Sequence, residues 1–329
     1  MTDSKERQTG FAASGGERND SSYDIVIIGS GAGGATIAQR LAPTGKSILI
    51  LERGDWLPVE KANWDAYEVF VKHRYRAKEE WIDRRGSRFH PTTHYWVGGN
   101  TAFYGAALFR FRKRDFDRVE HYGGLSPAWP ISYTDLRPYY DEAEKLWRVH
   151  GTRGEDPTDD NEAPPYPFAA IRHDREIAEL KLEFKQLGWR PFNLPLGIDR
   201  NDSAPDKGAC IRCTTCGGFP CFTRAKSDGR GVIDTLVDAY DNVTVQPNSR
   251  VLKLETDAAG KRVERIIYER GGEIESLKGD IVILAAGAPQ TQRRSSSHPR
   301  TPPIQTVSPI FPIRSGAITC SIPCRRYCQ

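Results

Sequence analysis

The chain has 329 residues, enough for one large domain or two ordinary ones with an ample core. Its longest apolar runs, Ile25–Ile28 and Ile281–Ala286, are too short for a bilayer, so we expect no membrane span. The net charge of +4 comes from residues 293–329, which hold six Arg and no Lys, Asp or Glu. The rest of the chain has 41 basic and 43 acidic residues, which argues against nucleic-acid binding.

Residues 1–22 are polar and small, and they lack the apolar segment of a signal peptide. This composition predicts a disordered lead. A cytoplasmic setting is the default expectation that follows.

Residues 23–54 predict a strand, a glycine turn, a helix and a second strand. Tyr23–Ile28 is a short apolar run rich in β-branched residues, as expected for a parallel strand buried on both faces. Gly29, Gly31 and Gly34 then form G-x-G-x-x-G. In this motif the first glycine makes the tight turn and the second lets the backbone approach a pyrophosphate. The third lets the following helix pack closely on the strand.

A helix and an acidic residue complete the pattern. Ala35–Leu41 is the predicted helix, whose N-terminal N–H groups and dipole point at the phosphates. Ser47–Leu51 is the second strand, and Glu52 lies 18 residues past Gly34, where an acidic residue can bind a ribose hydroxyl. Strand, helix and carboxylate together predict a dinucleotide-binding site.

Residues 56–88, rich in aromatic and charged side chains, predict helix and loop running over this first domain. In the next segment, Gly98-Gly99 followed by small and polar residues suggests a second place where backbone lies against a ligand. From composition alone, a glycine turn between packed elements is the stronger interpretation.

Two helices are predicted in the middle of the chain. The first starts near Trp129, where Ser132 and Asp135 form a capping box. The second runs from about Asp174 to Leu187, with Ile177, Leu180, Phe184 and Leu187 on one face and Gly188 as its stop.

From Val243 onward the pattern is β. Short strands separated by turns predict a meander: Val243–Gln246, Val251–Thr256, Val263–Tyr268 and a further strand after Gly271-Gly272. Ile281–Leu284 is a separate apolar strand, and the small residues 285–288 after it allow close approach to a docked cofactor.

Four segments taken together make the chain resemble the glucose-methanol-choline (GMC) family of FAD-dependent oxidoreductases. They are the dinucleotide motif, VGGNTAFYGAALFR at 97–110, WPISYTDLRPYY at 129–140 and DIVILAAGAPQT at 280–291, in the family's order. The resemblance covers about residues 22–292. Within the family, these motifs look most like those of the bacterial branch, whose members resemble alcohol or sugar dehydrogenases. The resemblance implies an α/β fold: a Rossmann-like FAD-binding domain with a parallel sheet and a β-meander, plus a partial substrate or cap region.

The resemblance also implies the domain limits and the FAD site. The FAD-binding domain would comprise residues 23–128 and 222–292, and residues 129–221 would form the partial cap region. Glu52 would bind the adenosine ribose, Val251 would meet adenine through its backbone, and the loop from Gly98 to Gly105 would contact the flavin ring. Asn100 and Thr101 replace the family's usual hydroxyl pair, and Tyr104 replaces its asparagine. The full set of implied FAD contacts is Gly29, Ser30, Gly31, Gly34, Glu52, Arg53, Gly98, Gly99, Asn100, Thr101, Tyr104, Gly105, Val251, Ala286 and Gly287.

The implied activity is oxidation of the CH–OH group of an alcohol or sugar-like substrate by hydride transfer to flavin N5. The electron acceptor is left open. Two alternatives are a flavoprotein of another reaction class and an inactive FAD-binding fragment. In such a fragment, loss of the substrate domain would expose apolar surface on the sheet side and favour aggregation.

In the family a catalytic His with a His or Asn partner lies downstream of the A-A-G-A strand, and nothing here matches that region. His298 is the only histidine after residue 173, and we interpret it as a bystander. No catalytic residue is therefore assigned. Residues 293–329 combine six Arg, six Pro, six Ser and three Cys without any helical or strand period. We expect this aberrant tail to be disordered and to be a frameshift product, with homologous sequence ending near Gln292 and the chain truncated there.

Cys210, Cys213, Cys216 and Cys221 form C-x2-C-x2-C-x4-C, a spacing typical of zinc or iron–sulfur ligands. Several GMC branches carry a similar loop before an A-K-[ST] element, here residues 225–227. A structural or disulfide role is favoured over a bound metal, and no metal ligand is assigned. His90 and His94 precede the second glycine loop, where some family members attach FAD covalently. Packing or surface exposure is the favoured interpretation for both.

Overall fold

The computed structural model describes residues 21–83 and 85–287. Its main element is a six-stranded sheet in the order β10-β2-β1-β13-β12-β11. Strands β10, β2, β1 and β13 pair in parallel, whereas β13, β12 and β11 are antiparallel neighbours. The strands are β1 (Ser22–Ile28), β2 (Ile48–Leu51), β10 (Val243–Gln246), β11 (Ser249–Thr256), β12 (Val263–Arg270) and β13 (Glu273–Leu284). The predicted α/β fold with a parallel sheet and a meander is confirmed.

Strand β13 differs from the prediction of two separate strands. It is continuous over twelve residues. Residues 273–277 pair antiparallel with β12, and residues 278–284 pair in parallel with β1. The pairing partner changes at Lys278, and this change accounts for the change from a polar to an apolar pattern. In the sequence the change in pattern resembles the end of one strand and the start of another, although the strand is continuous.

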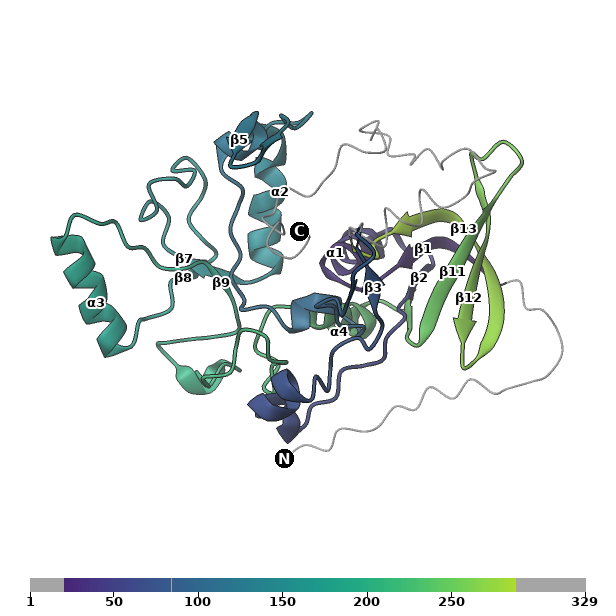
Figure 1. The fold of residues 1–329 in the computed structure, drawn as a ribbon, viewed down its shortest axis with the longest axis horizontal. Helices are drawn as coiled ribbons and strands as arrows, with labels where there is room; N and C mark the ends of the chain where they lie inside the picture. The colour runs from purple at the N-terminus through teal and green to yellow at the C-terminus, as the bar shows by residue number, and fades with distance from the viewer. Residues whose placement is uncertain (1–20, 84, 288–329) are drawn as a thin grey trace.

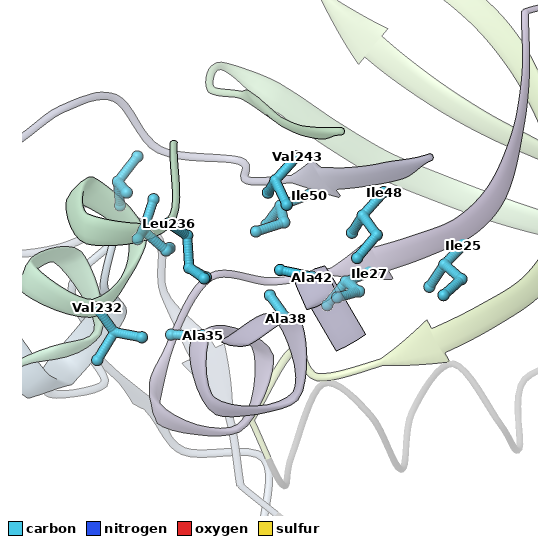
Figure 2. Close-up of a cluster of buried hydrophobic side chains, with 12 residues drawn as sticks. Ile25, Ile27, Ala35, Ala38, Ala42, Ile48, Ile50, Val232, Leu236 and Val243 are labelled. Atoms are coloured by element: carbon cyan, nitrogen blue, oxygen red, sulfur yellow. The ribbon is translucent and has the colours of Figure 1, made fainter. Parts of the chain in front are cut away.

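Residues Ile25–Ile28 of β1 and all of β2 are buried on both faces, as their apolar pattern predicts. On one face, Ile25 and Ile27 of β1 and Ile48 and Ile50 of β2 pack against two helices (Figure 2). These helices are α1 (Ala32–Leu41) and α4 (Gly229–Ala239). The alternate residues of β1 and β2 face the meander, where they pack with Val251, Ile266, Tyr268 and Leu277. The parallel part of the sheet is therefore a middle layer between two helices and the folded-over meander.

A second group of elements lies beside this layer, on the left of Figure 1. It contains α2 (Tyr133–Leu146), α3 (Arg175–Gln186) and small sheets made of β5 (Val119–His121), β6 (Gly124–Ser126), β7 (Val149–Gly151), β8 (Phe168–Ala169) and β9 (Leu196–Gly197). The predicted capping box of α2 is present: Asp135 N–H donates to Ser132 Oγ at 3.3 Å, and Ser132 N–H donates to Asp135 Oδ2 at 2.8 Å.

Helix α3 forms where the periodicity predicts it and ends at Gln186, two residues before Gly188, whose φ is +81°. None of its twelve residues, all of which the structure describes, is buried. Leu187 and Trp189, just after the helix, are 72% and 67% exposed. The predicted apolar face therefore stays largely exposed, although Phe184 contacts Trp189 with 5.4 Å between ring centres.

Between β2 and the second glycine loop, where helix and loop are predicted, the structure has short helical turns, loops and a pair of short strands. The helical turns are Lys61–Trp64 and Tyr67–Val71, and the paired strands are β3 (Trp81–Ile82) and β4 (Arg88–Phe89). The remaining short turns are Ala42–Thr44, Gly99–Ala102, Lys113–Phe116 and Pro205–Lys207. Among the described residues, no helix has the length and apolar character that crossing a membrane would require.

Candidate functional site

A cavity of about 650 Å³ lies at the carboxyl ends of β1, β2 and β13, next to the start of β11. Ligands of open α/β sheets bind outside the carboxyl ends of the strands, and this volume is within the usual range for cofactor sites. Eleven of the fifteen predicted FAD contacts line it together: Gly29, Ser30, Gly31, Glu52, Arg53, Gly99, Asn100, Thr101, Val251, Ala286 and Gly287. Gly34, Gly98, Tyr104 and Gly105 do not line it.

The first and third glycines of the motif hold the turn and the helix together. Gly29 has a φ of +103°, and a Cβ added there would lie 2.5 Å from the Ala285 carbonyl oxygen. A Cβ on Gly34 would lie 1.9 Å from the Gly29 carbonyl oxygen, so α1 packs directly on the turn. By contrast, a Cβ on Gly31 would meet nothing within 4 Å, because Gly31 borders the cavity.

The N-terminus of α1 is open toward this cavity. Gly31 is the N-cap, no side chain caps the helix, and its first turn has no acidic residue. Ala32 and Gly33 line the cavity. Free N–H groups and the positive end of the helix dipole suit a phosphate group. The arrangement therefore fits the pyrophosphate of a dinucleotide.

Glu52 lies at the end of β2 and is almost fully buried. Its Oε2 accepts hydrogen bonds from Ser30 N–H at 3.0 Å and from Ser30 Oγ at 2.5 Å, and its Oε1 accepts one from Gly54 N–H at 2.9 Å. Oε2 already accepts two hydrogen bonds, whereas Oε1 accepts one and keeps a lone pair that can accept a ribose hydroxyl. The same carboxylate thus orders the glycine turn and borders the cavity.

The second glycine loop reaches the cavity through three residues, Gly99, Asn100 and Thr101. The Asn100 Oδ1 accepts the His94 N–H at 2.8 Å, and the Thr101 hydroxyl accepts the Gly229 N–H at 2.8 Å. Both substituted polar residues are therefore engaged in holding the loop. Tyr104 points elsewhere, because its hydroxyl donates to the Ser227 carbonyl oxygen.

Of the outer wall of the cavity, Arg53 was predicted from the sequence, whereas Trp81 and Tyr95 were not. Arg53 lies 3.6 Å from the centre of the Tyr95 ring and 3.3 Å from a Glu79 carboxylate oxygen. The Tyr95 hydroxyl and Trp81 Nε1 also donate to Glu79. Burial alone would raise the pKa of Glu79, but the hydrogen bonds from Tyr95 and Trp81 and the Arg53 charge hold that pKa below its ordinary value. Arg53, Trp81 and Tyr95 all line the cavity.

His94 also lines the cavity, and its ring stacks on Phe103 with 3.7 Å between ring centres. Its Nδ1 lies 3.1 Å from the Tyr75 carbonyl oxygen. Burial lowers the pKa of this imidazole. His90, in contrast, is an exposed residue outside the cavity lining.

Cys210, Cys213, Cys216 and Cys221 are free thiols, so the disulfide that the sequence left possible is not formed. Across residues 21–83 and 85–287 there is no group of three or more His, Cys, Asp or Glu side chains arranged to hold a metal ion. Two of the sulfurs bond locally instead. Cys221 Sγ accepts the Ala225 N–H at 3.3 Å, and Cys213 Sγ accepts the Thr215 hydroxyl at 3.5 Å.

The predicted disordered lead, the aberrant tail and His298 fall outside the described residues, apart from Ser21 and Ser22. Strand β1 begins at Ser22, one residue before the predicted start. Nothing structural bears on the frameshift hypothesis, which stays a prediction.

Comparison with known proteins gives the family. A family model described as FAD dependent oxidoreductase matches residues 24–325, a span that continues past Gln292. The 6'''-hydroxyparomomycin C oxidase of Streptomyces lividus is 31% identical over 83% of this chain and 49% of its own length. The paromamine 6'-oxidase of Streptomyces fradiae is 32% identical over 73% of this chain and 42% of its own length. The chain thus spans about half the length of the curated relatives it matches.

Solved structures agree on the fold. An FAD-dependent oxidoreductase from Chaetomium thermophilum aligns with a TM-score of 0.54 and 17% identity, over 82% of this chain and 46% of its own. A curated relative from Mycobacterium tuberculosis, described as an uncharacterized GMC-type oxidoreductase, is 27% identical over 84% of this chain and 40% of its own. The chain belongs to the FAD dependent oxidoreductase family, as its GMC-like motifs predicted, and its cofactor is FAD.

Proposed function

We propose that this chain binds FAD in the cavity at the sheet edge and takes part in oxidising the CH–OH group of an alcohol or sugar-like substrate. The observation that carries the proposal is the convergence of residues 29–33, 51–53, 99–101, 249–251 and 285–287 on one cavity. These segments come from distant parts of the sequence, and each one suits the part of the dinucleotide that it would contact.

Different segments of the cavity wall bind different parts of FAD. The open N-terminus of α1 binds the pyrophosphate, and Glu52 accepts hydrogen bonds from the adenosine ribose. Val251, at the start of β11, lies against adenine, and Gly99–Thr101 lie against the flavin ring. Bound FAD supplies the hydride acceptor of the reaction. The described residues supply binding and orientation, and we assign no general base among them.

The substrate class rests on the relatives. Two are named as oxidases of 6'''-hydroxyparomomycin C and of paromamine. A more distant relative, 25% identical over 83% of this chain, is the fructose dehydrogenase large subunit of Gluconobacter japonicus. A polyhydroxylated substrate is therefore the first class to test. The electron acceptor stays open. A cytoplasmic setting is supported by the four free thiols, since a reducing compartment keeps cysteines unpaired.

An FAD-binding chain without activity of its own is a second candidate. It is favoured by exposed apolar side chains such as Leu187, Trp189 and Val71. Most of these exposed residues lie outside the six-stranded sheet, although Ile274 and Ile281 of β13 are among them.

Anaerobic reconstitution with FAD followed by addition of substrate separates the two. The proposed activity predicts a yellow, monodisperse protein whose flavin absorbance near the visible maximum bleaches with an amino sugar or a simple alcohol. A yellow protein that no member of an alcohol, polyol and amino-sugar panel bleaches supports the binding-only candidate. A colourless aggregate contradicts the proposal.

A further inference from the structure

The Lys226 ammonium is buried without a carboxylate partner. The residue is 4% exposed, and its Nζ donates to three backbone carbonyl oxygens: Tyr104 at 2.9 Å, Cys216 at 3.1 Å and Phe219 at 2.7 Å. No carboxylate of the described residues lies within ion-pair distance of it. Burying a charge costs free energy unless hydrogen bonds satisfy it. The three carbonyl groups therefore compensate the burial of this ammonium group.

These three carbonyl groups belong to two different loops. Tyr104 lies in the second glycine loop, whereas Cys216 and Phe219 belong to the cysteine-rich loop. Gly218 N–H also donates to the Phe103 carbonyl oxygen at 2.8 Å, so the two loops are joined at neighbouring points. Lys226 Nζ bonds to both loops at once.

The bonding between the lysine segment and the glycine loop is reciprocal. While Lys226 Nζ donates to the Tyr104 carbonyl oxygen, the Tyr104 hydroxyl donates to the carbonyl oxygen of Ser227. Three residues away along each segment, Gly229 N–H donates to the Thr101 hydroxyl at 2.8 Å. Thr101 lines the FAD cavity, so the chain of contacts runs from the buried ammonium to the cavity wall.

We propose that Lys226 is a positioning residue for the flavin end of bound FAD, because its ammonium fixes Gly99–Thr101 by tying Tyr104 to the cysteine-rich loop. The inference rests on the proposed FAD site and adds a residue to it that does not line the cavity. It also gives the cysteine-rich loop a task that requires no metal: the Cys216 and Phe219 carbonyl oxygens anchor the lysine.

The test compares two ligands that share one end. FAD has both the adenosine diphosphate half and the flavin half, whereas ADP occupies only the part bordered by Glu52, Val251 and the α1 N-terminus. The full chain and its Lys226→Met variant are titrated with each ligand by calorimetry. Lys226→Met is expected to weaken FAD binding by about tenfold or more, since charged hydrogen bonds to three carbonyls are lost, and to leave ADP binding within about twofold. Visible circular dichroism of the bound flavin should change as well.

Two further variants secure the interpretation. Lys207→Met is the matched control, because Lys207 lies exposed in the same region and its loss should change neither affinity. If Lys226→Met does not fold, Tyr104→Phe removes only the hydroxyl that binds the Ser227 carbonyl oxygen. It should weaken FAD binding selectively, by about threefold or more.

The outcomes separate this inference from the site on which it rests. Normal FAD affinity in Lys226→Met, or an equal loss of FAD and ADP affinity, overturns the positioning role while leaving the FAD site intact. If Lys226→Met does not fold, unchanged FAD affinity in Tyr104→Phe overturns it equally. A wild-type chain that is folded yet binds neither ligand overturns the proposed FAD site and the positioning role together.

Discussion

The Ser30 hydroxyl and the Glu52 carboxylate are joined by a hydrogen bond of 2.5 Å, and the same hydroxyl accepts the Gly98 N–H at 3.0 Å. One serine side chain therefore connects the glycine turn after β1, the acidic end of β2 and the second glycine loop. Because these are three of the segments that the motifs assign to FAD, the contact explains how separate motifs come together in one site.

Loss of the Glu52 charge should weaken FAD binding. Glu52→Gln replaces a carboxylate oxygen that accepts from Ser30 or Gly54 with an amide that donates, so at least one buried donor loses its partner. We expect FAD affinity to fall by about tenfold or more, measured by flavin fluorescence quenching. Glu264→Gln is the control, because Glu264 is exposed on β12. Equal affinities in the two variants would contradict this role of Glu52.

Two neighbouring glycines of α1 should respond differently to alanine. A Cβ on Gly34 would lie 1.9 Å from the Gly29 carbonyl oxygen, whereas a Cβ on Gly33 would meet nothing within 4 Å. Gly34→Ala should therefore lower the free energy of unfolding by about 1–3 kcal/mol or more. Gly33→Ala should leave it unchanged or raise it slightly, since alanine favours helix. Thermal unfolding of the two variants without FAD measures the difference, and equal stability would contradict the observed packing of α1 on the turn.

Two isoleucines of the parallel strands provide a test of the core. Ile27 in β1 is fully buried between the sheet and α1, while Ile281 in β13 is 52% exposed. Ile27→Ala should cost about 2–5 kcal/mol of unfolding free energy because it leaves a cavity. Ile281→Ala should change that free energy by less than about 1 kcal/mol. Urea unfolding of both variants gives the two values, and a larger loss for Ile281→Ala would mean that the layer order is wrong.

Glu79 predicts a specific pH dependence of stability. Its pKa is held below the ordinary value of 4.5, so its carboxylate stabilises the fold above that value, and the contribution is lost as the pH falls through the lowered pKa. Glu79→Gln should therefore be less stable than the wild type near neutral pH, with the difference closing in acid. Thermal unfolding of both proteins between pH 7 and pH 3 measures this difference in stability. A gap that stays constant with pH would show that the charge of Glu79 is not the cause.

The sequence predicts the parts of this site that depend on local patterns. Gly29, Gly34 and Glu52 follow a spacing that the strand–turn–helix geometry imposes, and their positions in the structure have the expected close contacts. Arg53 is among the predicted FAD contacts, but its contacts with Glu79 and Tyr95 could not be predicted, because they depend on how an irregular segment folds back over the sheet edge.

Sequence periodicity also does not identify which elements will pack or pair with one another in the fold. The apolar spacing of α3 correctly predicts a helix, but periodicity identifies a face without identifying what lies against it. Likewise, the pattern of β13 changes where its neighbour changes from β12 to β1, so one strand resembled two. Lys226 carries no sequence signal of burial, since its three acceptors are backbone carbonyl groups.

The most direct test of the account is the stoichiometry of FAD binding to the purified full chain, measured by calorimetry, with Gly31→Leu in parallel. Gly31 borders the cavity and has open space at its Cβ position, so a leucine side chain there should project into the cavity beside the α1 N-terminus, where the pyrophosphate is proposed to bind. The account predicts one FAD per wild-type chain, displaced by ADP, and no saturable binding to a Gly31→Leu variant that unfolds at the wild-type temperature. A folded wild-type chain that binds no FAD, or a Gly31→Leu variant that binds it normally, would contradict the account.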